Sequence, residues 1–303
     1  MTTGTHSPNQ RLRTVAVVGA GAMGHGIAQV LLRHGYNAVL HDVSKDLLTK
    51  AAEKISRGLA RDVEKGRLTA EQKEQALGRL KTTTQVSGLA PVDFVIEAVS
   101  ENFEVKAGIF RALEPVVRAT RPEVIFASNT SSISITKLAA TTSRPSQFIG
   151  LHFFNPVPVM KLVEVVAGLQ TSPETIATAQ ALAQSLDKTA IRVNDFPGFV
   201  SNRVLMPMIN EAIYAVMEGV ATPEAVDAVM KLGMNHPMGP IELADFIGLD
   251  VCLDIMNVLH DGFHDSKYRP CPLLEKMVNA GWLGRKSGRG FYDYAPGMDP
   301  SVT

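Results

Sequence analysis

A histidine and a glutamate in two neighbouring apolar runs are the side chains best suited to acid–base chemistry. His152 lies in the run FIGLHF at 148–153, and Glu164 lies inside KLVEVV at 161–166. A carboxylate among apolar side chains is costly to bury alone, so Glu164 needs a partner. A histidine would supply one, and the carboxylate would fix its tautomer and stabilise the imidazolium. The pair predicts an acid–base catalyst, while the alternative for His152 is a hydrogen-bonded core residue.

A glycine-rich loop near the start of the chain predicts dinucleotide binding. Gly19, Gly21 and Gly24 fit G-x-G-x-x-G and lie between a predicted strand and a predicted helix. These glycines allow the turn, the approach of a pyrophosphate and close helix–strand packing, and the helix N-terminus attracts phosphate. Asp42 ends the next strand about 20 residues further on, where it would bind both ribose hydroxyls and repel a 2′-phosphate. We expect NAD, with NADP less favoured; a glycine-rich turn without ligand is the alternative.

The polar stretch SNTSS at 128–132 follows a third predicted strand. Its hydroxyls and amide could bind a substrate oxygen or a nicotinamide. They could equally cap the helix expected at 134–140, because serine-rich caps are common. The residue types alone leave both interpretations open.

The elements that must position these residues alternate between strand and helix. Strands are expected at 14–19, 38–42, 93–98, 124–128, 148–153, 161–166 and 191–193, and helices at 22–34, 103–118, 134–140 and 173–186. This alternation predicts a Rossmann-like, doubly wound, mostly parallel α/β sheet, whose ligands bind at the carboxyl ends of the strands. The interval 43–82 is too long for one ordinary crossover, so a long helix or a helix pair should protrude there.

The pattern changes at the Pro197-Gly198 pair, after which only helical spacing follows. We therefore expect a flexible tail at 1–13, a nucleotide-binding domain at 14–196 and an all-helical domain at 197–303. His260 and His264 are four residues apart, but Gly262 separates them and no third ligand is evident. No metal site is expected.

Composition excludes several classes of protein. The 303 residues include 30 Lys plus Arg and 30 Asp plus Glu, so the formal net charge is zero and a general nucleic-acid binder is not expected. No apolar stretch reaches the roughly 18 to 20 residues of a membrane helix, and residues 1–13 lack the pattern of a secretory signal. With only Cys252 and Cys271 as cysteines, the default location is the cytoplasm.

Together, the motifs resemble those of the short-chain 3-hydroxyacyl-CoA dehydrogenases, and most closely the bacterial 3-hydroxybutyryl-CoA dehydrogenases. The resemblance runs from about residue 12 to 295 and rests on GAGAMGHGIA (19–28), ASNTSS (127–132), LHFFNPVPVMKLVEV (151–165), PGFVSNR (197–203), PMGPIEL (237–243) and GRKSGRGFYDY (284–294). It implies hydride exchange between NAD and an (S)-3-hydroxyacyl-CoA, and a homodimer formed through the helical domain.

The resemblance also implies roles for individual residues. His152 would be the catalytic acid/base and Glu164 its orienting carboxylate, while Ser131 and Asn202 would bind the substrate. The implied cofactor contacts are Gly19, Gly21, Ala22, Met23, Gly24, Asp42, Glu101, Lys106, Ser131, Asn155 and Lys286.

A basic stripe in the long insertion has its own possible use. Five cations, Lys50, Lys54, Arg57, Arg61 and Lys65, recur at helical spacing opposite an apolar face. They could receive the phosphates of coenzyme A, with Lys65 the preferred contact, or form an ordinary solvated face.

Two other functions stay open at this point. One is a related sugar-acid dehydrogenase of the L-gulonate type, which has a similar nucleotide loop and histidine. The other is a catalytically silent NAD-binding protein, although the resemblance implies four catalytic residues and all are present: His152, Glu164, Ser131 and Asn202.

Overall fold

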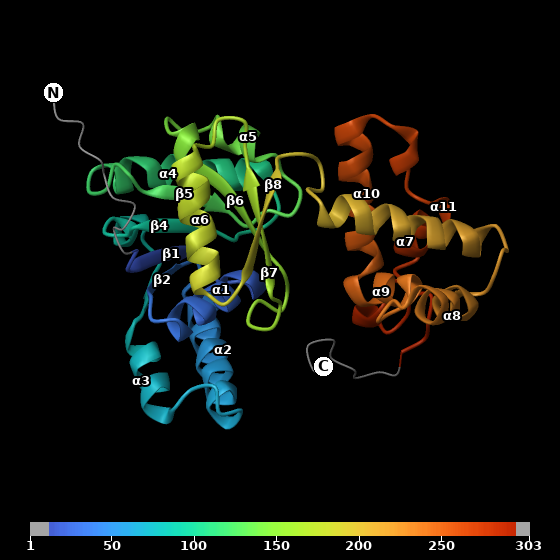
Figure 1. Cartoon of the computed structure of the whole chain (residues 1–303), viewed down its shortest axis with the longest axis horizontal. Helices are drawn as coiled ribbons and strands as arrows, with labels where there is room; N and C mark the ends of the chain where they lie inside the picture. The colour runs from blue at the N-terminus through green and yellow to red at the C-terminus, as the bar shows by residue number, and fades with distance from the viewer. Residues whose placement is uncertain (1–11, 295–303) are drawn as a thin grey trace. The chain divides into compact units, whose positions relative to one another are not determined.

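The computed structural model describes residues 12–294, so most of the expected 1–13 tail lies outside the described residues (Figure 1). The chain divides into two compact units, Met1–Asp195 and Phe196–Thr303. No helix in the described part of the chain is long and apolar enough to cross a membrane.

The first unit is built on one eight-stranded sheet with the order β3-β2-β1-β4-β5-β6-β7-β8. Its strands are β1 (Thr14–Val18), β2 (Asn37–His41), β3 (Leu80–Thr83), β4 (Phe94–Glu97), β5 (Ile125–Ser128), β6 (Phe148–Phe153), β7 (Leu162–Ala167) and β8 (Thr189–Asn194). Every neighbouring pair is parallel except β6 and β7. The predicted doubly wound, mostly parallel sheet is confirmed.

Helices cover both faces of this sheet because its central strands are apolar on both sides. The helices of the sheet are α1 (Ala22–Arg33), α4 (Phe103–Arg118), α5 (Ile135–Ala139) and α6 (Pro173–Ser185). Ile27 of α1 and Ile176 of α6 share one buried cluster with Ile149 of β6. On the opposite face, the ring of Phe110 from α4 lies 4.6 Å from that of Phe148. Successive residues of β6 therefore point to opposite faces of the sheet and pack into two separate cores.

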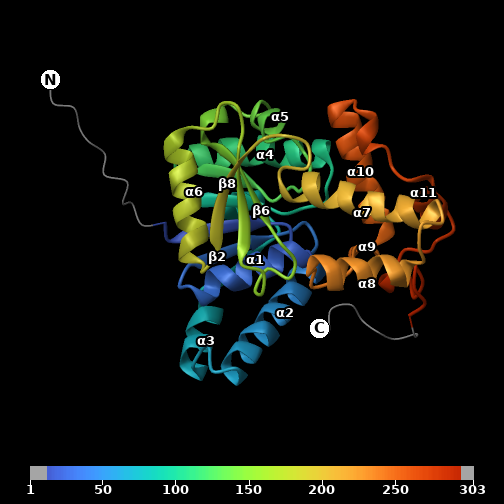
Figure 2. The same cartoon turned by 45° about the vertical axis from the view of Figure 1, so that its right-hand side comes forward.

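The insertion after β2 is a pair of helices, α2 (Lys45–Glu64) and α3 (Ala70–Gly78), which project from the sheet in both views (Figures 1 and 2). Ser44 caps α2, and Thr69 with Gln72 forms a capping box at α3. The chain then returns through β3, an edge strand that the sequence did not predict. Its four residues, LKTT, are all at least partly exposed, so no apolar run marks it.

The second unit is helical, as predicted. Its helices are α7 (Ser201–Met217), α8 (Pro223–Met234), α9 (Pro240–Ile247), α10 (Leu249–Phe263) and α11 (Pro272–Asn279). Two buried aspartates organise it. Asp227 accepts the N–H groups of Ile241 and Glu242 at the start of α9, and Asp245 accepts those of Phe291 and Tyr292. Asp245 thereby fastens the last described segment of the chain to the helical core.

Candidate active site

The glycine loop lies between β1 and α1, and it is packed too tightly for larger residues at Gly19 and Gly24. Gly19 has a φ of +104°, and a Cβ added at Gly24 would lie 1.7 Å from the carbonyl oxygen of Gly19. A Cβ added at Gly21 would meet no atom within 4 Å, and no side chain caps the N-terminus of α1. The loop therefore offers an open backbone surface at a helix N-terminus, which fits a pyrophosphate.

Asp42 follows β2 and is held against this loop. One carboxylate oxygen accepts the Ala20 N–H at 2.9 Å, and the other accepts the Ser44 N–H at 2.9 Å. Each carboxylate oxygen can accept more than one hydrogen bond, so Asp42 keeps capacity for a ribose hydroxyl. The residues present fit a dinucleotide without a 2′-phosphate.

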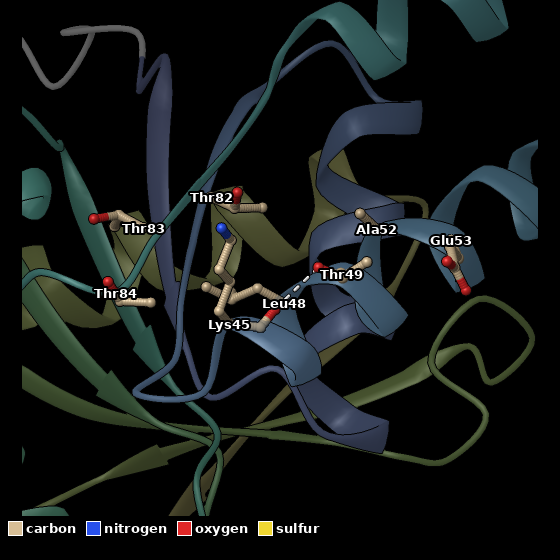
Figure 3. A pocket seen from close by; sticks show the side chains of 8 residues that line it. All are labelled: Lys45, Leu48, Thr49, Ala52, Glu53, Thr82, Thr83 and Thr84. Atoms are coloured by element: carbon tan, nitrogen blue, oxygen red, sulfur yellow. Dashed lines mark hydrogen bonds between the residues drawn. The ribbon is translucent and has the colours of Figure 1, made fainter.

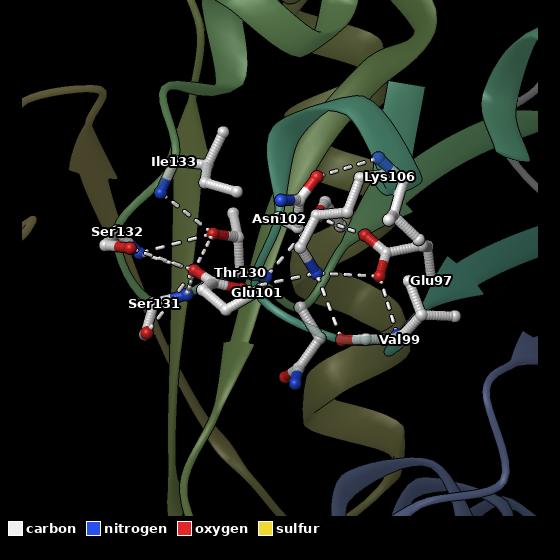
Figure 4. A network of polar contacts seen from close by, with 12 residues as sticks. Glu97, Val99, Glu101, Asn102, Lys106, Thr130, Ser131, Ser132 and Ile133 are labelled. Atoms are coloured by element: carbon white, nitrogen blue, oxygen red, sulfur yellow. Dashed lines mark hydrogen bonds and ion pairs between the residues drawn. The ribbon is translucent and has the colours of Figure 1, made fainter. Parts of the chain in front are cut away.

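A buried ion network lies at the carboxyl ends of β4 and β5 (Figure 4). The Lys106 Nζ lies 2.7 Å from Glu97 Oε1, and their side chains are 1% and 0% exposed. Glu97 also accepts the Ser128 hydroxyl at 2.6 Å and the Val99 N–H at 2.7 Å. The charge of Lys106 is thus neutralised inside the protein by Glu97, which is not among the site residues expected from the sequence.

Glu101 joins this network to the polar stretch SNTSS at 128–132, which is called the serine loop from here on. Its carboxylate lies 3.3 Å from Lys106 Nζ and accepts the N–H groups of Ser131 at 3.0 Å and Ser132 at 3.1 Å. Burial raises the pKa of the Glu101 carboxyl, but the Lys106 ammonium and the hydroxyl donors of the loop outweigh burial and hold that pKa below its usual value. The interaction fixes Ser131 at the end of β5, next to the strand that carries His152.

His152 and Glu164 are brought together by the antiparallel pairing of β6 and β7. They are direct partners in the β6–β7 register, and His152 Nδ1 lies 2.8 Å from Glu164 Oε2. Their exposed fractions are 8% and 2%. The Phe154 ring packs beside the imidazole, with ring centroids 4.5 Å apart. A buried carboxylate at this distance orients an imidazole and stabilises its protonated form.

Asn129 ties the serine loop to the histidine strand. Its side-chain oxygen accepts the N–H of Phe153 at 3.0 Å, directly after His152, and its own N–H donates to the Glu97 carbonyl at 2.7 Å. The sequence had placed the amide in a candidate ligand loop. The residue types alone do not show that the Asn129 amide contacts a strand nearly 25 residues further along the chain.

The remaining candidate site residues belong to other segments of the chain. Asn155 is exposed in the segment after β6, and Lys65 is exposed at the C-terminus of α2. Asn202 is buried at the start of α7, and Lys286 lies 2.5 Å from Asp250, both in the second unit.

A pocket of about 650 Å³ lies beside the Asp42 segment (Figure 3). Its walls come from α2 and from the end of β3, with Lys45 pointing toward Thr82. The Thr83 carbonyl accepts the Asp42 N–H, which links the pocket wall to the loop region. Sequence reasoning missed this pocket because its two walls are separated along the chain and one wall is the unpredicted strand.

Comparison with known proteins shows which family the chain belongs to. Residues 14–196 match the family model of the 3-hydroxyacyl-CoA dehydrogenase NAD binding domain, and residues 198–294 match that of the C-terminal domain. The chain belongs to the 3-hydroxyacyl-CoA dehydrogenase family. The family, its enzyme class and NAD as the cofactor, all expected from the motifs, are thereby confirmed.

Individual members of this family are similar over nearly their whole length. A probable 3-hydroxybutyryl-CoA dehydrogenase of Bacillus subtilis is 56% identical over 283 residues, which is 93% of this chain and 98% of that protein. The 3-hydroxybutyryl-CoA dehydrogenase of Bradyrhizobium diazoefficiens is 54% identical over 283 residues, which is 93% of this chain and 96% of that protein. The crystal structure of (S)-3-hydroxybutyryl-CoA dehydrogenase from Ralstonia eutropha superposes with a TM-score of 0.89 at 51% identity, covering 94% of this chain and 99% of that one.

Proposed function

We propose that the protein interconverts (S)-3-hydroxybutyryl-CoA and acetoacetyl-CoA with NAD as the hydride acceptor or donor. The observation that carries this proposal is the buried His152–Glu164 pair, which lies in the sheet of an NAD-binding domain. The similar proteins named as 3-hydroxybutyryl-CoA dehydrogenases support the choice of substrate.

The roles of the residues follow from their positions. Bound NAD supplies the site that accepts or donates the hydride. Because Nδ1 of His152 contacts Glu164, its Nε2 is the atom that takes the proton from the substrate hydroxyl during oxidation and returns it during reduction. Glu164 holds the ring and stabilises the imidazolium. Ser131, fixed by Glu101, hydrogen-bonds the substrate 3-oxygen, and Asn202 is a second proposed substrate contact.

The basic face of α2 would receive the phosphates of coenzyme A. The buried side of this helix includes Leu48, Ile55 and Leu59, so its cations are directed to solvent. Lys65, at the helix end, is the contact that we propose for these phosphates.

The assembly and location of the protein are also proposals. Val229, Leu232 and Met234 of α8 are each more than half exposed, which supports a homodimer formed through the helical unit. Cys252 and Cys271 are both free thiols, which is consistent with a cytoplasmic location.

One assay tests the activity directly. Purified protein is mixed with acetoacetyl-CoA and NADH, and then with NADPH, and the loss of reduced-nicotinamide absorbance is followed. We expect rapid consumption of NADH and much slower consumption of NADPH. If neither is consumed, the protein is catalytically silent with this substrate. Reduction of NAD by L-gulonate in the same preparation would instead assign it to the sugar-acid branch.

Replacing Asp42 with alanine is expected to weaken the preference for NADH. The variant loses an acceptor for the ribose hydroxyls and the charge that repels a 2′-phosphate, so kcat/KM for NADH should fall about ten-fold or more. The ratio of kcat/KM for NADPH to that for NADH should rise. The matched control is Asp46→Ala, which removes an exposed acid from the first turn of α2. An unchanged cofactor ratio in Asp42→Ala would exclude Asp42 as the selective residue.

A further inference from the structure

Lys188 is a buried cation that the proposed reaction does not use. It lies in the turn between α6 and β8, and only 6% of its surface is exposed. Its Nζ donates to the carbonyl oxygens of Val157 at 2.6 Å and Met160 at 2.7 Å. Both acceptors belong to the segment 154–161, which connects β6 to β7. A lysine from a different part of the chain therefore fastens the connection between the strands of His152 and Glu164.

The same connection also packs against α1. Val157 is 2% exposed, and a Cβ added at Gly26 of α1 would lie 3.0 Å from its side chain. Backbone bonds from Val159 and Met160 to the Pro156 carbonyl close a turn within the segment. The connection thus contacts the helix that follows the nucleotide loop and is hydrogen-bonded by the Lys188 ammonium, and these two sets of contacts together form the clamp. Asn155 is exposed in this segment, two residues before Val157.

We propose that Lys188 is a positioning residue, which holds the 154–161 connection so that Asn155 and the His152–Glu164 pair keep the geometry needed for hydride transfer. The proposal rests on the proposed function for its kinetic consequence. Its structural part, the immobilisation of the connection, can be tested without any turnover.

Burial and the neighbouring charges change the pKa of Lys188, so a pH titration can detect its environment. Burial, together with the nearby cations Arg33 of α1 and Lys161, lowers the pKa of Lys188 from 10.5 to about 8, while Asp187 acts in the opposite direction. Asp187 in turn lies 3.1 Å from His34 of α1. The carbonyl oxygens of Val157 and Met160 therefore face an ammonium that is costly to keep charged.

Hydrogen–deuterium exchange of the cofactor-free protein tests the clamp. In Lys188→Met, which keeps the length of the side chain but has no donor, the peptide covering 154–161 should exchange about ten-fold faster or more. Peptides from β1 should be unchanged, and Lys188→Arg should restore much of the protection. Lys81→Met, which removes an exposed lysine of β3 at the other edge of the sheet, is the matched control, and its 154–161 peptide should exchange as that of the wild type does. Equal exchange of 154–161 in Lys188→Met and wild type would overturn the clamp.

The pH dependence of stability gives a second readout. The unfolded state holds the Lys188 proton up to about pH 10.5, whereas the folded state loses it from about pH 8. Between these values the unfolded state binds more protons, so the wild type should gain stability relative to Lys188→Met as the pH rises.

The kinetic part separates positioning from a purely structural role. We expect kcat of Lys188→Met to fall about ten-fold, with a smaller change in KM for acetoacetyl-CoA and substantial recovery in Lys188→Arg. Faster exchange with unchanged kcat would confine Lys188 to stability and overturn its positioning role. If the wild type itself has no activity, the exchange result still decides the clamp, and the failure lies with the proposed function.

Discussion

Replacing His152 with alanine is expected to lower kcat for acetoacetyl-CoA reduction by about 10²- to 10⁴-fold. The imidazole is the group that exchanges a proton with the substrate oxygen, and alanine cannot replace it. NADH affinity should change little, because the glycine loop and Asp42 lie on other strands. Steady-state kinetics and a fluorescence titration with NADH measure the two quantities separately.

The controls for this prediction are His260→Ala and Glu164→Gln. His260 is a partly exposed histidine of α10, and its loss should leave kcat unchanged. In Glu164→Gln the ring keeps a hydrogen-bonding partner but loses the charge that stabilises the imidazolium, so kcat should fall by a smaller factor than in His152→Ala. Near-normal turnover in both site variants would remove the pair from the mechanism.

Replacing Lys106 with methionine is expected to cost about 3–5 kcal/mol of stability. The substitution leaves the Glu97 carboxylate, which is 0% exposed, without the ammonium that neutralises it. It also releases Glu101 from one of its partners, so the loop that contains Ser131 should loosen. The free energy of unfolding of the first unit is measured by urea denaturation of the cofactor-free protein.

The double variant Glu97→Gln, Lys106→Met distinguishes an uncompensated charge from simple loss of packing. Without the buried carboxylate, part of the lost stability should return, and the coupling between the two positions should be clearly non-additive. Lys81→Met, at an exposed position of β3, is the control and should change stability little. If the double variant is less stable than Lys106→Met, the charge argument is wrong.

Much of the fold could be predicted because its central strands are short apolar runs separated by helical spacing. The exception is β3, whose exposed residues carry no such run and whose place at the sheet edge depends on the turn of the chain after α3. The direction of β7 was not predicted either. The connection from β6 to β7 is too short for the helix of a parallel crossover. Its length is therefore the sequence signal that indicates an antiparallel pair.

The candidate site was less accessible from sequence than the fold. His152 and Glu164 could be paired because each is polar in an apolar strand, and the same signal at Glu97, inside FVIEA, was overlooked. Asn129 and Lys188 act on backbone groups of distant segments. Such contacts depend on the sheet order and on the path of the connections, and no local pattern of residue types encodes them.

Tracing the hydride tests the central claim most directly. The protein is given acetoacetyl-CoA and NADH that carries deuterium at both C4 positions of the nicotinamide ring, and the acyl-CoA product is analysed by mass spectrometry and proton NMR. The account predicts (S)-3-hydroxybutyryl-CoA with one deuteron at C3, formed at a rate that collapses in His152→Ala. Unlabelled product, or acetoacetyl-CoA recovered unchanged, would contradict it.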